Sequence, residues 1–226
     1  MLSSGQLQQL LSGAWTTIQV TAYSAVIGTL LALVGGVSSL SGSRLLRWFT
    51  RVYVELFRGV SAIILLFWVY FTLPQLFGIF LTPLQAGMLA LGTNMGAYGS
   101  EIARGAIQAI PKGQTEAAIA INLSPFRRLR HVVLPQAIVL MLPPFGNLLI
   151  EVMKASALVS LIDLSDLTER AQNLRTLRAA ASLEIFTAVL VMYFLISLSI
   201  TLGVRMLERR FGRGLEVGSG LGGAVK

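Results

Sequence analysis

Long uncharged apolar stretches, separated by shorter polar stretches, dominate the sequence. No charged residue occurs between positions 1 and 43, and none occurs between positions 59 and 100. A helix needs about 20 apolar residues to cross the hydrocarbon core of a membrane, because each residue adds about 1.5 Å. The first stretch therefore predicts one membrane span. The second stretch predicts two spans, with a turn marked by Pro74, Gly78 and Pro83.

Two further apolar stretches complete this pattern. Residues 132–150 are interrupted by proline and glycine, so we expect a kinked or broken helix whose freed backbone groups face protein or water. The interrupting residues are Pro135, Pro143, Pro144 and Gly146. Residues 185–204 form an uninterrupted apolar stretch. The sequence therefore predicts five spans, at approximately 14–37, 59–77, 83–103, 132–150 and 185–204.

The composition indicates an integral membrane protein. Hydrophobic residues make up 54% of the 226 positions and charged residues only 12%, a balance too apolar for a soluble domain. The net charge of +8 does not indicate a nucleic-acid partner, because no basic surface interleaved with aromatic residues accompanies it. With no cysteine and a single histidine, no cluster of metal ligands is expected. We predict one transmembrane domain over residues 1–211 and a flexible, glycine-rich cytoplasmic tail over residues 212–226.

The basic residues predict the orientation of the chain. Fourteen of the 18 lysines and arginines gather on one side of the predicted spans, and the positive-inside rule places that side in the cytoplasm. The N-terminus then lies outside, whereas the C-terminus and the loop between the third and fourth spans lie inside. Residues 163–178 lie outside and carry apolar residues at helical spacing, as an amphipathic helix on the outer membrane surface would. These apolar residues are Leu164, Leu167, Ala171 and Leu174.

The loop between the third and fourth spans carries helix signals of its own. Glu116-Ala117-Ala118 begins a strongly helix-forming run, and we expect its acid in the first turn, where the helix dipole favours it. Asn122 readily adopts the left-handed conformation that ends a helix. Ser124 and Pro125 predict the cap and the first residue of a second short helix. We therefore expect a pair of short helices at the cytoplasmic surface.

This loop resembles a known motif. The ordered residues Glu116, Ala117, Ala118, Asn122, Leu134 and Pro135 resemble the EAA loop of bacterial ABC importer permeases, in which a glycine stands at the position of Asn122. Segments elsewhere look like the polar amino acid uptake branch of type I importers, namely residues 53–59, 96–105, 110–114 and 142–147. Other segments look like ectoine and hydroxyectoine permeases, namely residues 123–125, 157–162 and 164–168.

The resemblance implies an all-α integral membrane protein with the fold of type I ABC importer permeases. The cytoplasmic loop would form coupling helices that dock on an ATPase. The implied partners are a second permease subunit, homologous or identical, two ATP-binding cassette ATPases and an extracytoplasmic solute-binding protein. ATP and Mg would bind in the ATPase, and this chain contains no glycine-rich loop ending in Gly-Lys-Ser or Gly-Lys-Thr.

The implied role is a transport subunit of the bacterial inner membrane, not an enzyme, with no catalytic residue, metal or cofactor of its own. Its solute would be a polar amino acid or a zwitterionic, ectoine-like compatible solute. Polar residues inside the predicted spans are candidates for the solute path. Asn94 and Tyr98 share one face of the third span, and Glu151 and Lys154 follow the interrupted fourth span. For each residue, hydrogen bonding or pairing within the helix bundle is the structural alternative.

Two further patterns in the spans indicate packing and pairing. Gly92, Gly96 and Gly99 form a small face on the third span, which is typical of close helix packing in membranes. Three opposite-charge pairs lie three residues apart and can neutralise each other on one helix face. The pairs are Glu55 with Arg58, Glu101 with Arg104, and Glu151 with Lys154.

Other classes of protein remain open at this point. An ion-coupled secondary transporter or channel also places polar groups in broken helices, but it does not need the cytoplasmic loop. An intramembrane enzyme would need a nucleophile and a base. Ser156 and Lys154 lie two residues apart and do not face each other on a helix, and His131 lies in the loop. A scaffold protein is possible if the loop binds a partner other than an ATPase.

Overall fold

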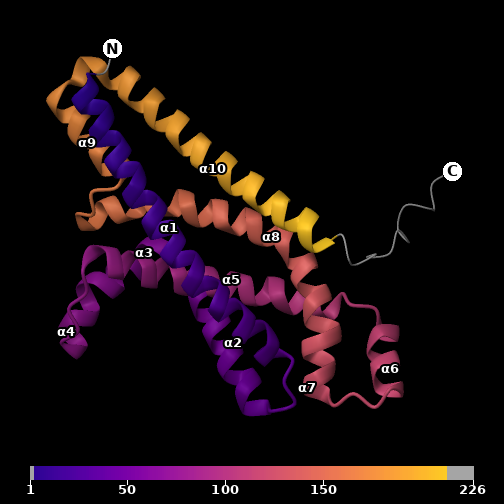
Figure 1. Ribbon diagram of the computed structural model, residues 1–226. Helices are drawn as coiled ribbons and strands as arrows, with labels where there is room; N and C mark the ends of the chain where they lie inside the picture. Colours follow the sequence, from indigo (N-terminus) through magenta and orange to yellow (C-terminus); the bar gives the residue numbers. More distant parts are fainter. Residues whose placement is uncertain (1–2, 213–226) are drawn as a thin grey trace.

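The computed structural model describes residues 3–212, so residues 213–226 of the predicted tail lie outside the described residues. Four long helices carry the architecture of this part of the chain (Figure 1). They are α1 (Ser4–Ser39), α5 (Pro83–Gln108), α8 (Leu134–Ala155) and α10 (Ser182–Gly212). The other elements are shorter helices, and no strand occurs between residues 3 and 212.

Two of the long helices begin where the sequence supplies a capping box. At the start of α1 the Gln6 N–H donates to the Ser3 hydroxyl, and the Ser3 N–H donates to the Gln6 side chain. Thr82 and Gln85 form the same reciprocal pair at the start of α5. Each pair satisfies backbone donors that a helix start leaves unpaired. α1 therefore begins well before the predicted span at residue 14, whereas α5 begins at the predicted residue, Pro83.

Small residues bring α1 and α5 into close contact. A Cβ added at Gly28 would lie 2.7 Å from the Met95 sulfur, and a Cβ added at Gly92 would lie 2.9 Å from the Ile27 Cβ. These distances leave no room for a methyl group, so the two backbones approach closely, as in other membrane helix pairs built on small residues. The predicted small face of the third span is therefore a packing surface.

The chain turns sharply between α2 (Arg44–Gly59) and α3 (Ala62–Phe67). α2 and the helical segment Ala62–Phe77, which ends with α4 (Leu73–Phe77), meet at an angle of 105°. The predicted second span, residues 59–77, therefore begins at this corner. α2 is a separate helix that the sequence analysis did not predict.

Two π-helical turns precede prolines. Trp68–Thr72 ends two residues before Pro74, and Leu129–Val133 ends two residues before Pro135. A proline lacks an N–H and its ring crowds the carbonyl four residues earlier, so a wider turn relieves the clash without breaking the helix. The predicted turn between the second and third spans is present, because the helix ends at Gly78, whose φ is 66°, and α5 begins at Pro83. Pro74 does not belong to the turn, because it lies inside a helix.

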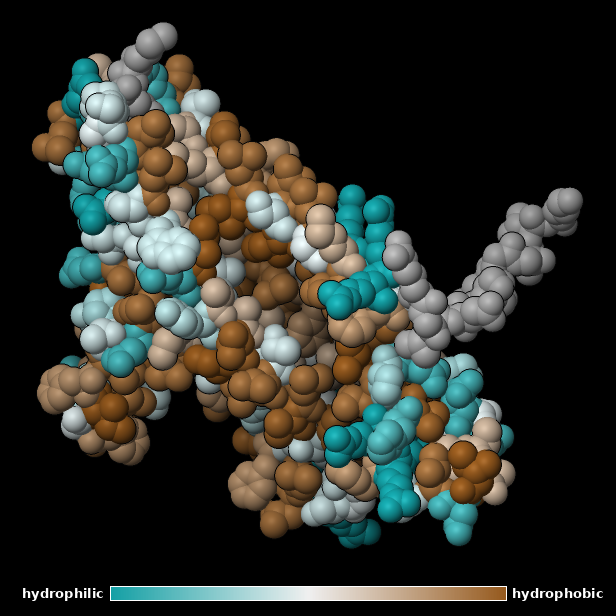
Figure 2. All heavy atoms as spheres, viewed as in Figure 1, coloured by the Kyte–Doolittle hydropathy of each residue, from teal (hydrophilic) through white to brown (hydrophobic). Residues whose placement is uncertain are grey.

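By length and composition, three of the described helices can cross a membrane, or four if the bent pair of α2 with Ala62–Phe77 counts as one span. The three are Ser4–Ser39, Pro125–Ile162 and Ala179–Gly212. α5 has 26 residues, long enough for a span, but polar residues such as Asn94 and Glu101 lower its hydropathy. The total of five spans stays a prediction. On the face that Figure 2 shows, a broad hydrophobic band runs through the middle, and hydrophilic residues gather at the upper left and the lower right.

The fourth predicted span belongs to one long, bent helix. α7 (Pro125–Arg128), the π-helical turn and α8 follow one another without interruption, and a 3-10 turn over Ser156–Ile162 continues them. Pro143 and Pro144 lie inside α8, and the helix changes direction along its course (Figure 1). The predicted kink is therefore present, but the helix is not broken.

α9 (Leu167–Leu177) has different surroundings from those predicted. Leu167, Ala171 and Leu174 are at most 3% exposed, because they pack with apolar residues at the starts of α1 and α10, including Leu10 and Ile185. The apolar stripe therefore packs against protein and not against lipid, while the position of the helix at the outer membrane surface stays a prediction. α9 packs against the N-terminal parts of both α1 and α10 and so joins them.

Candidate coupling loop and solute path

α6 (Lys112–Ala120) ends as the sequence predicts. The Leu123 N–H donates to the Ala118 carbonyl at 3.0 Å, and the Asn122 N–H donates to the Ile119 carbonyl at 2.8 Å. These two bonds form a Schellman motif, which satisfies carbonyls that a helix end leaves unpaired. The φ of Asn122 is 58°, so the predicted left-handed residue is confirmed. The chain therefore reverses with a defined geometry after α6.

Glu116 does not lie in the first turn of α6. The helix begins at Lys112, directly after Pro111, and its first turn contains no acid. The predicted interaction of Glu116 with the helix dipole is therefore wrong, because that effect fades beyond the first turn. Glu116 and Ala117 are exposed, whereas Ala118 is only 3% exposed. The triplet thus presents two residues outward and one toward the protein.

The second predicted short helix is the beginning of a much longer one. α7 starts at Pro125 as expected, but the Ser124 side chain makes no capping hydrogen bond. The helix then continues through the π-helical turn into α8, where Leu134 is half-buried and Pro135 is exposed. The second arm of the loop is therefore joined rigidly to the bent helix.

The tip of the loop exposes three large apolar side chains within a short segment. Ile119 is 54% exposed, Ile121 is 71% exposed and Phe126 is 68% exposed. The Gln136 side-chain amide of α8 donates to the Gln114 side-chain oxygen of α6 at 3.4 Å, so the two arms of the loop are joined by a hydrogen bond. Apolar side chains gathered on an otherwise polar surface are typical of a contact site for another protein.

Asn94 and Tyr98 hold the corner between α2 and α3. The Asn94 amide donates to the Phe57 carbonyl at 2.8 Å, and the Tyr98 hydroxyl donates to the Arg58 carbonyl at 3.3 Å. Both carbonyls belong to the last turn of α2, where a helix end leaves acceptors unpaired. Tyr98 nevertheless stays 38% exposed. Both residues thus stabilise the corner by hydrogen bonds. Their place on the solute path stays a prediction.

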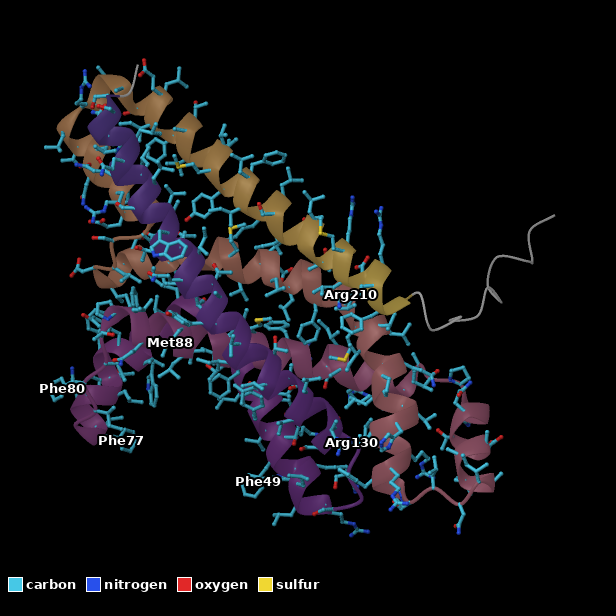
Figure 3. The ribbon with its side chains drawn as sticks, in the orientation of Figure 1. Phe49, Phe77, Phe80, Met88, Arg130 and Arg210 are labelled. Carbon is cyan, nitrogen blue, oxygen red and sulfur yellow. The ribbon has the colours of Figure 1, made fainter. Side chains whose placement is uncertain are left out.

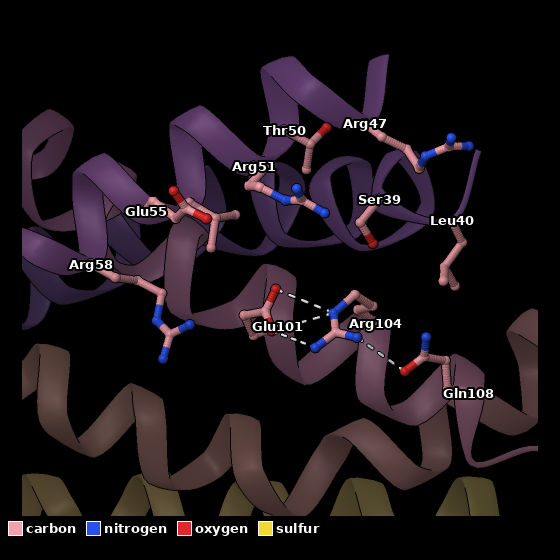
Figure 4. Close-up of a pocket in the computed structure, with 11 residues that line it drawn as sticks. Ser39, Leu40, Arg47, Thr50, Arg51, Glu55, Arg58, Glu101, Arg104 and Gln108 are labelled. Atoms are coloured by element: carbon pink, nitrogen blue, oxygen red, sulfur yellow. Dashed lines mark hydrogen bonds and ion pairs between the residues drawn. The ribbon is translucent and has the colours of Figure 1, made fainter. Parts of the chain in front are cut away.

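One of the three predicted charge pairs forms within residues 3–212. Glu101 and Arg104 are joined by an ion pair of 2.7 Å and by further hydrogen bonds of 3.3 Å (Figure 4). Glu55 and Arg58 form no ion pair among the residues that the structure describes. The Arg58 guanidinium instead lies over the Tyr98 ring, 5.2 Å from its centre. The prediction of a pair there is wrong.

Glu151 and Lys154 are both exposed on α8. No ion pair joins them in the part of the chain that the structure describes, as expected where water solvates each charge. No described hydrogen bond brings them to Asn94 or Tyr98, which lie on α5. The place of Glu151 and Lys154 on the solute path therefore stays a prediction, as it does for Asn94 and Tyr98.

The sequence analysis missed a buried polar site at the start of α9. Asp166 is fully buried, caps α9 and accepts the Glu169 N–H at 2.8 Å. Burial raises the pKa of the Asp166 carboxyl to about 6, although backbone hydrogen bonds from Glu169 and Thr168 act to lower the pKa. The next N–H, that of Leu167, donates to the Thr17 hydroxyl of α1 at 3.3 Å. An Asp with a Glu three residues later was a readable helix-start signal.

Comparison with known proteins places this geometry in a family. The description "binding-protein-dependent transport system inner membrane component" matches residues 10–213. The probable amino-acid ABC transporter permease y4tF of Sinorhizobium fredii is 46% identical over 201 residues, covering 87% of this chain and 84% of that protein. The L-cystine transport system permease TcyB of Bacillus subtilis is 34% identical, covering 90% of this chain and 87% of that protein.

Solved structures agree with this assignment. An amino acid ABC transporter crystallised with histidines has a TM-score of 0.81 and 32% identity, covering 90% of this chain and 94% of that chain. The MetNI methionine ABC transporter in an inward-facing conformation has a TM-score of 0.79 at 22% identity, covering 93% and 99%, a likeness of fold alone. The predicted fold class is confirmed. The chain belongs to the family of binding-protein-dependent transport system inner membrane components, and it is the permease subunit of an amino-acid ABC importer.

Proposed function

We propose that this permease subunit moves a polar amino acid or a zwitterionic, ectoine-like compatible solute into the cytoplasm. Membership of the family implies an ATPase and a solute-binding protein as partners. The composition that we propose is two ATPase subunits, one extracytoplasmic binding protein and a second permease subunit, homologous or identical. ATP and Mg would bind in the ATPase. The names of two relatives, permeases for L-cystine and for glutamine, support an amino acid as the solute.

The observation that carries the coupling role is the way the loop is joined to the bundle. Its tip exposes Ile119, Ile121 and Phe126, and its reversal is fixed at Asn122. Its second arm runs without a break into the bent helix α8. A force that the ATPase applies at the tip would therefore move α8 as a lever instead of being absorbed by a flexible hinge. In this proposal Glu116, Ala117, Ala118, Leu134 and Pro135 belong to the coupling surface and its support.

Glu151 and Lys154 support a path for a zwitterion. They lie one turn apart on α8 and both are exposed. Neither is neutralised by the other, so a carboxylate and an ammonium stay available for the opposite charges of an amino acid. Asn94 and Tyr98 would line the same path from α5, beside the corner that they stabilise. The outward position of the N-terminus is part of this proposal, and the start of α1 lies far from α6 (Figure 1).

The test is uptake into vesicles that contain the permease, its ATPase and its binding protein. Labelled glutamine, cystine and ectoine are offered to the wild type, to Glu151→Gln and to Lys154→Gln, with Arg175→Gln on α9 as an exposed control. We expect ATP-dependent uptake of at least one solute, and a raised KM in the two α8 variants only. Uptake without the ATPase would overturn the importer role. An unchanged KM in both α8 variants would overturn the solute path.

A further inference from the structure

A charged pocket lies between the end of α1, α2 and α5 (Figure 4). Its volume is about 420 Å³. Six charged side chains line the pocket, namely Arg47, Arg51, Arg58, Arg104, Glu55 and Glu101. Four guanidinium groups therefore face two carboxylates, and the pocket carries an excess of positive charge.

The four arginines differ in whether their N–H groups already form hydrogen bonds or ion pairs. Arg104 is paired with Glu101, and Arg47 donates to the Ser41 carbonyl. Arg58 stacks over an aromatic ring, and its donors form no hydrogen bond or ion pair in the described part of the chain. Arg51 forms no such bond there either, and its side chain points from α2 into the pocket (Figure 4). Two guanidinium groups are therefore available to an anion.

The opposite face of α2 is apolar and exposed. Five residues at three- and four-residue spacing are 43–66% exposed, namely Leu45, Trp48, Phe49, Val52 and Leu56. Phe49 projects away from the bundle (Figure 3). A helix with one apolar and one basic face is typical of the boundary between lipid and water. The basic residues also predict that this boundary is the cytoplasmic one.

We propose that the pocket binds the phosphate group of an anionic phospholipid of the cytoplasmic leaflet, with its acyl chains along the apolar face of α2. A guanidinium donates two parallel hydrogen bonds to a phosphate, and basic pockets between membrane helices suit such headgroups. Free phosphate shares this chemistry but gains nothing from an apolar helix face, so the structure favours the lipid. The proposal depends neither on the solute nor on the coupling loop.

Trp48 provides the test, because it lies on α2 and the chain has only two other tryptophans. Trp15→Phe with Trp68→Phe leaves Trp48 as the sole fluorophore of the full chain in phosphatidylcholine vesicles. Quenching by phosphatidylglycerol with brominated acyl chains is compared with quenching by brominated phosphatidylcholine. We expect brominated phosphatidylglycerol to quench Trp48 more strongly than brominated phosphatidylcholine, which defines the preference for phosphatidylglycerol. The preference should fall by about fivefold for each arginine removed, in Arg51→Gln and in Arg51→Gln with Arg58→Gln.

Arg44→Gln is the matched control, because Arg44 begins the same helix but does not line the pocket. A preference that is lost in the pocket variants and kept in Arg44→Gln supports the site. No preference in the wild type, or an equal loss in all variants, overturns it. Inorganic phosphate at constant ionic strength tests the other source of the anion. It should displace little phosphatidylglycerol, and complete displacement would identify a free-anion site and overturn the lipid assignment.

Discussion

α6 and α9 are short helices at opposite ends of the molecule (Figure 1), yet their apolar residues have opposite surroundings. Leu167 and Leu174 of α9 are at most 3% exposed, whereas Ile119 and Ile121 at the end of α6 are 54% and 71% exposed. The stripe of α9 is covered by α1 and α10 of the same chain. No part of the described chain covers the apolar residues at the end of α6. Burial therefore distinguishes a helix that stabilises the fold from one that we propose binds a partner.

The largest effect is expected from breaking the α9 side of this comparison. Leu174→Ala removes a buried side chain and should lower the free energy of unfolding by about 2–5 kcal/mol. The matched change Ile119→Ala acts on an exposed side chain and should change the free energy by about 0.5 kcal/mol or less. Thermal unfolding of both variants in detergent measures the difference. Equal midpoints would show that α9 does not hold the bundle together.

The close approach of α1 and α9 gives the next effect. A Cβ at Gly13 would lie 2.7 Å from the Asp166 carbonyl oxygen and 2.9 Å from the Leu167 Cα. Because both atoms are backbone, Gly13→Ala should cost about 1–3 kcal/mol in the same unfolding assay. Gly203→Ala is the control, since a Cβ there meets nothing within 4 Å. This variant should raise the free energy of unfolding by about 0.5–1 kcal/mol. If both variants gain stability, α9 does not pack tightly on α1.

The pH dependence of Asp166 sharpens the account of the α9 end. Burial raises the pKa of this carboxyl from 3.8 to about 6, so the folded state holds the proton more tightly than the unfolded state. The contribution of Asp166 to stability is then fully present below pH 3.8 and declines as the pH rises through 6. Asp166→Asn keeps a capping side chain but does not ionise. At neutral pH it should be more stable than the wild type by about 1–3 kcal/mol, with little difference at pH about 4. A wild type that gains relative stability with rising pH contradicts this.

Local features of the loop were readable from the sequence, whereas the corner between α2 and α3 and the contacts that hold it were not. The left-handed turn at Asn122 follows from the residue itself and from the helix before it. The position of Glu116 in its helix was misread, because the start of α6 is set by Pro111 and Lys112. The acceptor of the Asn94 amide is the backbone carbonyl of Phe57, 37 residues earlier, and the pattern of residue types does not predict this contact.

The same limit explains why the contacts of α9 were not predicted. Its apolar spacing was predicted correctly, but an apolar stripe fits lipid and protein equally well. Leu10 and Ile185, which cover the stripe, belong to other helices, and Leu10 lies far away in the sequence from α9. The continuous helix across Pro135 was also unreadable, because the π-helical turn that accommodates the proline leaves no pattern in the residue types.

A smaller effect is expected at the turn of the α6 side. Asn122→Val places a β-branched residue at a φ of 58° and should cost about 1–2 kcal/mol locally, whereas Asn122→Gly should keep the turn. Hydrogen exchange of the Leu123 N–H, which donates to Ala118, reports the Schellman motif directly. Faster exchange is expected in the valine variant only. Equal exchange in both variants would show that the left-handed residue does not hold the loop.

The proposed ATPase contact at the α6 end is tested most directly by ATP hydrolysis in vesicles that contain the permease, its ATPase and its loaded binding protein. Glu116→Lys reverses an exposed charge beyond the first turn of α6, so the variant should insert and fold normally. Glu208→Lys, on α10 outside the loop, is the control for charge reversal. We predict that stimulation of ATP hydrolysis by the binding protein is lost in Glu116→Lys and kept in Glu208→Lys. Wild-type stimulation and uptake in Glu116→Lys would contradict the coupling role of the loop.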